Sequence, residues 1–194
     1  MSFTIEHMKE VSRIAENIDT SKIEEMIDLL FEVKSSGGRL FILGVGGSAG
    51  NASHAVNDFR KLAGIESYAP TDNVSELTAR TNDEGFETIF TGFLSVSRLS
   101  SRDCLLVLSV GGGDVEKGIS TNLCSAIDYA KSKGAKVIGI VGRDGGHTHK
   151  FADTCLVIPP INPAAITPHS EAFQAIVWHL MVSHPKLKVN ATKW

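Results

Sequence analysis

"FILGVGGSAGNASHAVNDF", residues 41–59, is the stretch that decides the fold predicted by this sequence. It opens with a short apolar run, passes through glycines, and continues with a histidine and an aspartate four residues apart. A continuous apolar run bounded by glycines is typical of a strand buried on both faces. Glycines after such a strand let the backbone take positive φ and approach a ligand closely. We therefore expect a buried strand, a ligand-contacting turn and a helix.

The same alternation continues along the chain. The expected strands are 39–44, 104–109, 136–142 and 154–159, with a weaker one at 66–70, and the expected helices are 48–63, 73–83, 84–99, 122–134 and 167–184. Strands that alternate with helices predict βαβ units and a parallel sheet with helices on both faces. The predicted fold is a three-layer α/β/α doubly wound sheet of about five parallel strands. Ligands of such sheets bind beyond the carboxyl ends of the strands.

The first 36 residues have helix-like apolar spacing, interrupted by "DTSK" at 19–22, which contains capping residues. This pattern predicts two antiparallel N-terminal helices. The 194 residues are expected to form one domain, with a helical pair at 1–37, an α/β core at 38–184 and a tail at 185–194. We expect the tail to be either a poorly anchored end or a partner contact.

Composition excludes several classes of function. A net charge of −3 and a pI near 6.2 provide no basic surface for nucleic acid or an anionic membrane. The longest apolar runs are far shorter than the ~20 residues that span a bilayer, and the N-terminus does not resemble a signal peptide. The three cysteines have no CxxC spacing, which is typical of reduced, partly buried thiols. We expect a cytoplasmic protein.

Three strand ends carry glycine-rich turns, at 44–48, 109–114 and 142–146. A helix that follows such a turn presents free N–H groups and partial positive charge to a phosphate or carboxylate. Ser48 could add a hydroxyl donor there. The alternative is that the glycines only make tight strand–helix turns.

Other loop motifs fit poorly. No GK[ST] follows the glycines, as a P-loop requires, and no serine lies in a GxSxG context. A dinucleotide fingerprint is matched by Gly44, Gly46 and Ala49, with Glu66 about twenty residues on. It is weak, because the motif follows two helices and a second glycine loop competes as the anion site.

His54 and Asp58, at i and i+4, share one face of their expected helix. In the last helix, Glu171 and His179 lie about 80° apart around an ideal helix axis. These four residues could hold a borderline metal such as zinc, or act as general acid and base. A solvated helix face is the alternative for the first pair.

The last helix also has a start signal. Thr167 is expected as its N-cap and Pro168 as its first residue, with His169 in the first turn. His147 and His149 follow the third glycine turn, and we expect them to be surface loop histidines.

With these residues assembled, nearly the whole chain resembles the sugar isomerase (SIS) domain family, and within it the phosphoheptose isomerases. Members typically show a G-N-G-G-S loop, a His-x-x-x-Glu pair, an Asn-Asp pair, a Ser-Thr-Ser-Gly loop, and a Gln and a His eight residues apart near the end. The matching substrate-contacting positions here are Val45, Gly46, Gly47, Ser48, Asp58, Asn82, Asp83, Ser109, Val110, Gly111, Asp114 and Glu171. The resemblance implies His54, Asp58, Glu171 and His179 as zinc ligands, with Asp58 as base and His179 as acid/base.

The chain departs from the family pattern at both loops. Valine replaces the asparagine of the first loop, and the second loop reads "SVGGGD", with Ser109 as its one hydroxyl. The N–H groups of residues 111–113 could still hold an anion. Asp114 would repel a phosphate, so we expect it to point away and cap a helix that begins near Val115.

The resemblance implies a homotetramer with active sites between subunits and an aldose–ketose isomerase of a sugar phosphate. The expected reaction converts sedoheptulose 7-phosphate to a heptose 7-phosphate. Two alternatives stay open: a non-catalytic SIS module that binds a sugar phosphate or a protein partner, and an isomerase of a different phosphosugar.

Overall fold

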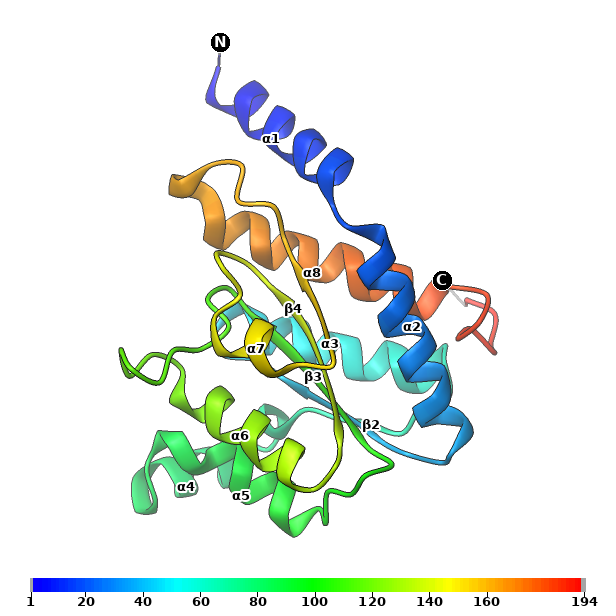
Figure 1. The fold of residues 1–194 in the computed structure, drawn as a ribbon, viewed down its shortest axis with the longest axis vertical. Helices are drawn as coiled ribbons and strands as arrows, with labels where there is room; N and C mark the ends of the chain where they lie inside the picture. Colours follow the sequence, from blue (N-terminus) through cyan, green and yellow to red (C-terminus); the bar gives the residue numbers. More distant parts are fainter. Residues whose placement is uncertain (1, 193–194) are drawn as a thin grey trace.

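A five-stranded parallel sheet forms the middle layer of the molecule (Figure 1). The computed structural model describes residues 2–192. The strands are β1 (Leu40–Leu43), β2 (Ser67–Tyr68), β3 (Cys104–Ser109), β4 (Lys136–Val141) and β5 (Thr154–Val157). Each lies within a predicted strand, so the sheet and its parallel sense are confirmed.

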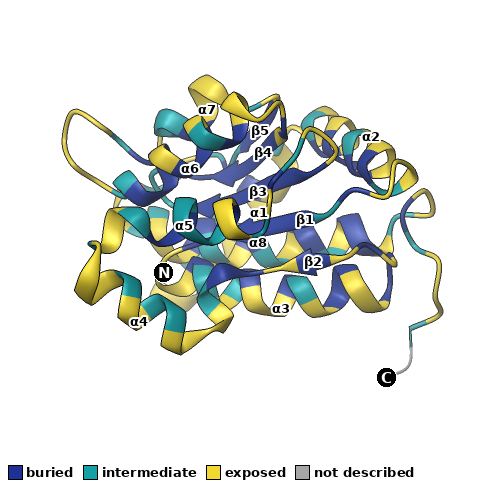
Figure 2. Cartoon of the chain, turned by 90° about the horizontal axis from the view of Figure 1, so that it is seen from below, coloured by how far each residue is buried: buried dark blue, intermediate teal, exposed yellow. Residues whose placement is uncertain are grey.

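Helices cover both faces of the sheet. They are α1 (Phe3–Asn17), α2 (Thr20–Ser35), α3 (Gly47–Lys61), α4 (Val74–Asp83), α5 (Ile89–Val96), α6 (Thr121–Ser132), α7 (Gly146–Phe151) and α8 (Ile166–Ser183), with three short 3₁₀ turns, η1 (Pro70–Asp72), η2 (Phe86–Thr88) and η3 (Pro163–Ala165). Alternate strand residues point to opposite faces. Leu40 and Ile42 pack with α2, α3 and α8, whereas Phe41 and Leu43 pack with α5 and α6 (Figure 2). This is the predicted three-layer architecture.

The strand order β2-β1-β3-β4-β5 creates one reversal of direction, at β1 and β3. The helix after β1, α3, packs on one face of the sheet, and the helix after β3, α6, packs on the other. A doubly wound sheet opens a crevice at such a switch point, beyond the carboxyl ends of the two strands. The first and second glycine turns therefore face a common crevice.

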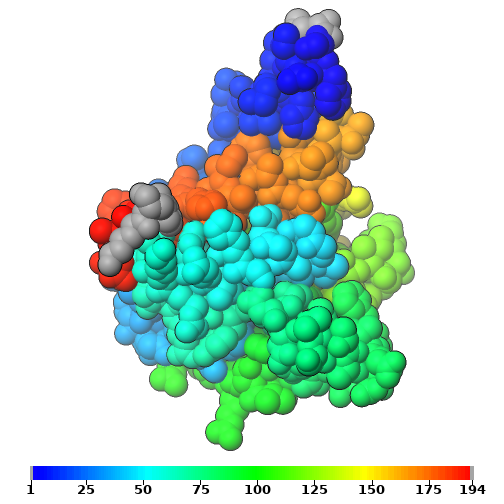
Figure 3. Space-filling view, turned by 180° about the vertical axis from the view of Figure 1, so that it is seen from behind, coloured from blue at the N-terminus to red at the C-terminus, as the bar shows by residue number. Residues whose placement is uncertain are grey.

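The two N-terminal helices are not antiparallel, as the sequence analysis predicted. α2 continues in roughly the direction of α1 (Figure 1). Only Ile18 and Asp19 separate them, and both have extended backbone conformations that carry the chain onward. The predicted break is confirmed, because the Asp19 side chain accepts from the N–H of Ser21 and caps α2. α1 projects from the body and buries only Ile14 (Figure 3).

Three local predictions near the C-terminal half are wrong. His147 and His149 lie on the short helix α7 rather than in a loop, and His147 pairs with Asp128 at 2.8 Å. α8 begins at Ile166 with Ala165 at its N-cap position, so Thr167 is not the cap and Pro168 is not the first residue of the helix. The preceding turn η3 is capped instead, by the Asn162 side chain.

The tail is anchored over the part that the structure describes. Leu187 is fully buried, and its carbonyl accepts from the Lys34 ammonium at 3.1 Å. The N–H groups of Val189 and Asn190 donate to the carbonyl of Leu62. The expectation of a poorly anchored end is therefore wrong for these residues.

All three cysteines are buried and free, as expected. Burial raises the pKa of the Cys155 thiol to about 12, so it stays protonated at neutral pH. Among the described residues, no helix is both long and apolar enough to cross a membrane.

A buried ion pair joins the starts of β1 and β3. The Asp103 carboxylate, 2% exposed, accepts from the backbone N–H and guanidinium of Arg39 and from the N–H and hydroxyl of Ser100. Burial opposes ionisation of Asp103, but the hydrogen bonds from Arg39 and Ser100 outweigh it and hold its pKa below the usual value. The charged carboxylate thus holds two central strands in register.

Replacing this carboxylate is expected to destabilise the fold. Asp103→Ala should lower the free energy of unfolding by about 3 kcal/mol, because it leaves the buried donors of Arg39 and Ser100 without their acceptor. Because the folded-state pKa of Asp103 is lowered, its contribution is present above the unfolded-state pKa near 4 and is lost as pH falls through the folded-state pKa. Urea unfolding from pH 7 to pH 3 measures both effects.

Asp28→Asn is the matched control, because Asp28 forms an exposed ion pair with Lys186. It should change the free energy of unfolding by less than about 1 kcal/mol. Equal effects of the two substitutions would contradict the assigned role of Asp103.

Candidate active site between two parallel helices

α3 and α8 pack side by side and bring the predicted site residues together (Figure 3). On α3 the contacting positions are spaced by four, three and four residues, which places them on one face of the helix. We call the contact the α3–α8 seam; it consists of Gly47, Asn51, His54 and Asp58 of α3 with Glu171, Gln174, Trp178 and His179 of α8. Both helices run in the same direction, because earlier residues of one meet earlier residues of the other.

His54, Asp58 and His179 form a group whose potential ligand atoms all lie within 4.8 Å of one another. The Asp58 Oδ2 atom lies 3.8 Å from His54 Nε2 and 3.7 Å from His179 Nε2. The Asp58 side chain is 2% exposed, whereas those of His54 and His179 are 58% and 45% exposed. Two solvent-accessible imidazoles therefore cover one buried carboxylate.

The two oxygens of Asp58 have different partners. Oδ1 accepts a hydrogen bond from the Asn57 amide at 2.8 Å. Oδ2 is buried and has no hydrogen-bond partner among the described residues. A buried carboxylate oxygen without a partner is costly, so a cation or a donor is the group that fits beside it.

His179 is oriented by its own helix. Its Nδ1 lies 2.8 Å from the backbone carbonyl of Ala175. A carbonyl only accepts, so Nδ1 carries a proton, and in the neutral ring Nε2 then has a free lone pair directed to the Asp58 side. Histidines that bind metals commonly donate their other N–H to a backbone carbonyl in this way. The donor set of His54, Asp58 and His179 fits a zinc ion with three protein ligands.

Glu171 does not join this group. Its carboxylate lies at the other end of the seam, where a Cβ added to Gly47 would be 2.5 Å from Glu171 Oε2. Eight residues separate Glu171 from His179, which amounts to about 12 Å along a helix axis. The two residues point to similar sides of the helix, as the sequence predicted, but they lie too far apart along its axis to share one metal ion. Glu171 instead places negative charge at the N-terminus of α3, where the helix dipole favours it.

Three seam residues were missed by the sequence analysis. The Asn51 amide donates to the carbonyl of Glu171 and to Gln174 Oε1, at 2.9 and 3.1 Å. Trp178 stacks on His179 with ring centroids 3.5 Å apart and meets His54 edge-on at 4.7 Å. Gln174 Nε2 and Trp178 Nε1 are buried and lack partners among the described residues. Helical spacing could have predicted these three residues. Asn51 lies on the same face of α3 as His54, and Gln174 and Trp178 lie on the same face of α8 as Glu171.

The first glycine turn leads from β1 directly into α3. Gly46 precedes α3 with a φ of 64°, a conformation that favours glycine, and no side chain caps the helix. The N–H groups of Gly47 and Ser48 form no backbone hydrogen bond in the described chain. Ser48 is buried, and Val45 is 37% exposed at the mouth of the turn. The start of α3 therefore favours negative charge, and the Glu171 carboxylate beside Gly47 already supplies one such charge.

The second glycine turn packs against the third. A Cβ on Gly112, whose φ is 70°, would lie 1.9 Å from the carbonyl oxygen of Gly145, so only glycine fits. The carbonyls of Gly112 and Gly113 accept from the N–H groups of Thr148 and His147 at the start of α7. The Gly112 N–H donates to the Ser109 hydroxyl at 3.0 Å. The expectation that all N–H groups of residues 111–113 are open to an anion is therefore wrong for Gly112.

Asp114 does point away from the turn, but it caps no helix. It forms an isolated antiparallel bridge with Ile119, and α6 begins only at Thr121. Its carboxylate accepts from the N–H and ammonium of Lys117, at 3.0 and 2.8 Å, and these hydrogen bonds lower its pKa. The ion pair with Lys117 offsets the charge of Asp114 near the glycine turn.

A family model described as "SIS domain" matches residues 5–142. The chain belongs to the SIS domain family. The match includes α3 and the first two glycine turns but ends before α8.

Individual relatives match the chain over most of its length. The lincomycin biosynthesis protein LmbN of Streptomyces lincolnensis is 34% identical over 80% of this chain, which spans 59% of that protein. A phosphoheptose isomerase of Rhodospirillum rubrum is 33% identical over 75% of this chain and 74% of the relative. The structure of phosphoheptose isomerase GmhA from Neisseria gonorrhoeae superposes with a TM-score of 0.80 and 26% identity, over 92% of this chain and 94% of that one.

Two residues that the SIS resemblance implicates lie apart from the seam. Asn82 and Asp83 end α4, and the Asn82 amide donates to Asp83 Oδ1 at 2.7 Å. Both side chains are exposed. In the described chain no hydrogen bond or ion pair links them to the seam.

Removing the charge of Asp58 is expected to stabilise the metal-free SIS domain. Asp58→Asn should raise the free energy of unfolding by about 1 kcal/mol, because an amide replaces a buried oxygen that lacks a partner and can donate to His179 Nε2. Chemical unfolding in the presence of a chelator measures the difference.

Asp128→Asn is the control, because Asp128 is an exposed aspartate that pairs with His147. It should change the free energy of unfolding by less than about 0.5 kcal/mol. A loss of stability in Asp58→Asn would contradict the unpaired state of Asp58 Oδ2.

Proposed function

We propose that this chain is an aldose–ketose isomerase that converts sedoheptulose 7-phosphate to D-glycero-D-manno-heptose 7-phosphate. The observation that carries the proposal is the buried, unpaired oxygen of Asp58 between two accessible histidines. The similarity to proteins named phosphoheptose isomerase supports it.

The reaction moves a proton between C1 and C2 of the sugar through an enediol. It requires a base at carbon, a proton source at oxygen, and stabilisation of the developing oxyanion. Asp58 and His179 are the proposed pair that transfers the protons. His179 Nε2 has a free lone pair and the ring is half-exposed, so a substrate reaches this atom whenever it is not bound to the metal. Asp58 lies beneath it and is the second group of the pair, through the oxygen that has no hydrogen-bond partner among the described residues.

Zinc is the proposed metal, held by His54, Asp58 and His179. When bound, it would polarise the carbonyl and hydroxyl oxygens of the substrate as a Lewis acid. Trp178 keeps the imidazoles in place by packing against both rings. Glu171 and the N–H groups at the start of α3 are proposed to contact substrate rather than this ion.

The spacing along α3 suits a long-chain sugar phosphate. Gly47 and His54 are seven residues apart, about 10 Å along the helix axis. An extended six- or seven-carbon sugar with a terminal phosphate can reach from the anion-accepting turn to the histidines, whereas a triose phosphate is too short. Ser48, Ser109 and the N–H groups of Gly111 and Gly113 are proposed phosphate contacts. Val45 and Val110 are proposed to line the same substrate path. Asn82 and Asp83, at the end of α4, are proposed to contact the substrate from outside the seam.

A second candidate is an isomerase of a different phosphosugar. It is favoured by the second glycine turn, where Val110 and Gly111 lack hydroxyls and Ser109 supplies the one hydroxyl. Turnover of a panel of five- to eight-carbon ketose phosphates, followed by NMR, separates the two candidates.

We infer that the enzyme assembles as a homotetramer with active sites between subunits. Apolar side chains of α8 next to His179 are exposed, Ile176 to 50% and Leu180 to 42%. Those of Phe3, Ile5 and Met8 on α1 are exposed to between 50% and 83%. Covering these faces with another copy would remove apolar surface from water and shield the imidazoles.

The buried, protonated thiols suit the reducing cytoplasm that we propose for the protein.

Loss of either proton-transferring group should abolish most of the activity. Asp58→Asn and His179→Ala are each expected to lower kcat by roughly 10²- to 10⁴-fold, the usual effect of removing a general acid or base. ¹H NMR in D₂O, observing exchange at C1 and C2 together with product formation, measures the effect. Asp58→Glu should keep measurable turnover, because it retains the carboxylate.

His149→Ala is the control, since His149 is exposed on α7 away from the seam, and it should leave kcat unchanged. Isomerisation that stays intact in both Asp58→Asn and His179→Ala would overturn the proposed function.

Assembly should depend on the exposed apolar face of α8. Leu180→Glu is expected to shift the sedimentation coefficient from that of a tetramer to a smaller species and to reduce turnover, because it buries a charge in the proposed interface. Val96→Glu on α5, where the valine is 75% exposed, should change neither. A tetramer unaffected by Leu180→Glu would place the interface elsewhere.

A further inference from the structure

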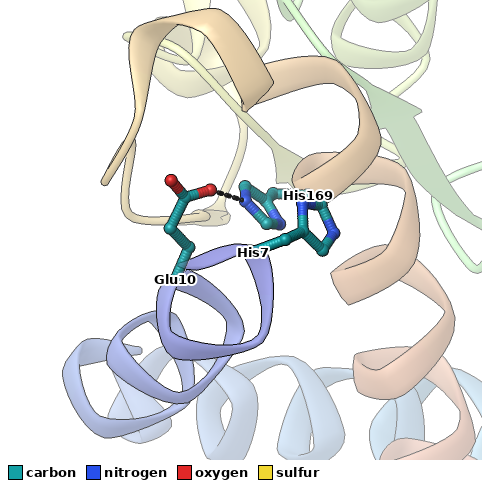
Figure 4. A group of neighbouring side chains, drawn as sticks. All are labelled: His7, Glu10 and His169. Carbon is teal, nitrogen blue, oxygen red and sulfur yellow. Dashed lines mark hydrogen bonds and ion pairs between the residues drawn. The ribbon is translucent and has the colours of Figure 1, made fainter. Parts of the chain in front are cut away.

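A second group of metal-ligating side chains lies where α1 meets the start of α8. His7, Glu10 and His169 offer ligand atoms that all lie within 4.8 Å of one another (Figure 4). His7 and Glu10 are three residues apart and share one face of α1, and His169 comes from the first turn of α8. None of the three belongs to the α3–α8 seam.

The group is built around a buried histidine. The His169 side chain is 3% exposed, and its Nε2 lies 2.7 Å from Glu10 Oε2. The His7 ring stacks on His169 with centroids 4.5 Å apart (Figure 4). The buried imidazole therefore has a carboxylate on one side and a second imidazole stacked on its ring.

A second residue fixes the carboxylate. The Asn162 amide donates to Glu10 Oε1 at 2.7 Å, which leaves Oε2 as the oxygen directed at His169. The hydrogen bond from His169 lowers the pKa of Glu10, so the carboxylate is ionised. Metal-binding carboxylates are commonly held by such a second hydrogen bond.

From this arrangement we propose a second divalent-cation site, at His7, Glu10 and His169, that clamps α1 to the body of the protein. Two imidazoles and a carboxylate are a known zinc donor set. An ion would replace the hydrogen bond between Glu10 and His169. The proton on His169 Nε2 would move to Nδ1, so that the neutral ring binds through Nε2 and no proton has to be released. His7 swings from its stacked position to present a ring nitrogen.

The proposed ion would restrain α1, which has few contacts with the body of the protein. Ile14 is the one buried residue among those described in α1, which projects from the body and otherwise touches it mainly through His7, Glu10 and Val11 (Figures 1 and 3). An ion at residues 7 and 10 would hold the outer half of α1 against α8 and fix the direction of its apolar face. The site is thus structural, with no part in proton transfer.

Metal counting in a variant without the seam ligands tests this site. His54→Ala/His179→Ala, stripped with chelator and titrated with ZnCl₂, is expected to bind one zinc per chain, and Co²⁺ should give visible d–d absorption. Adding His7→Ala should abolish that binding, whereas adding His149→Ala should not. Asn162→Ala is expected to weaken it by about 10- to 100-fold.

Hydrogen exchange provides a readout that is independent of activity. In the His54→Ala/His179→Ala variant, zinc should slow exchange of the amides of α1 at least about 10-fold, because the ion restrains the helix. Absence of zinc binding in this variant, binding that survives His7→Ala, or unchanged exchange in α1 would overturn the proposal. Failure of the seam as a metal site would instead leave wild type and His54→Ala/His179→Ala with the same single zinc.

Discussion

Asp58 holds its carboxylate beneath two histidines that come from helices far apart in the sequence, and this contact depends on the packing of α3 against α8. The two helices run parallel along the same face of the sheet. α3 is held there by its direct connection to β1, and α8 by its return from β5 over the same face. A change in either helix position would separate His54 from His179. The sheet therefore determines the site through the helices that it supports.

The two ends of the α3–α8 seam have different chemical environments. Its early end, with Gly47 and Glu171, lies beside the crevice at the β1–β3 switch point, where helix N–H groups suit an anion. Its later end holds Asp58, whose free oxygen needs a cation or donor. A ligand that is anionic at one end and carries exchangeable protons at the other satisfies both ends. The isomerase proposal follows from this polarity along the helix axis.

The N-terminal helix, α1, is held to the body by polar contacts rather than by burial in the core. α1 contributes little to the core and exposes apolar side chains along its length. Its polar contacts to the body, through Glu10 to His169 and Asn162, fix its direction instead. This contact joins a carboxylate to an imidazole, and both are groups that a divalent cation binds, whereas apolar packing offers no such ligand. An oligomer that buries the apolar face of α1 would depend on the same contact, because the contact sets the direction of the helix.

The sequence by itself determined the five strands, their parallel sense and the pairing of His54 with Asp58, because apolar runs, helical periodicity and i,i+4 spacing are local properties. It also placed His179 on the last helix. Only the tertiary structure decided that Glu171 meets Gly47 at the start of α3 and lies outside the group of His54, Asp58 and His179. It also decided that α1 and α2 do not fold back on each other and that His169 meets Glu10. Those outcomes depend on how far apart two helices lie and in which direction they run. Side-chain spacing within one helix carries no information about either.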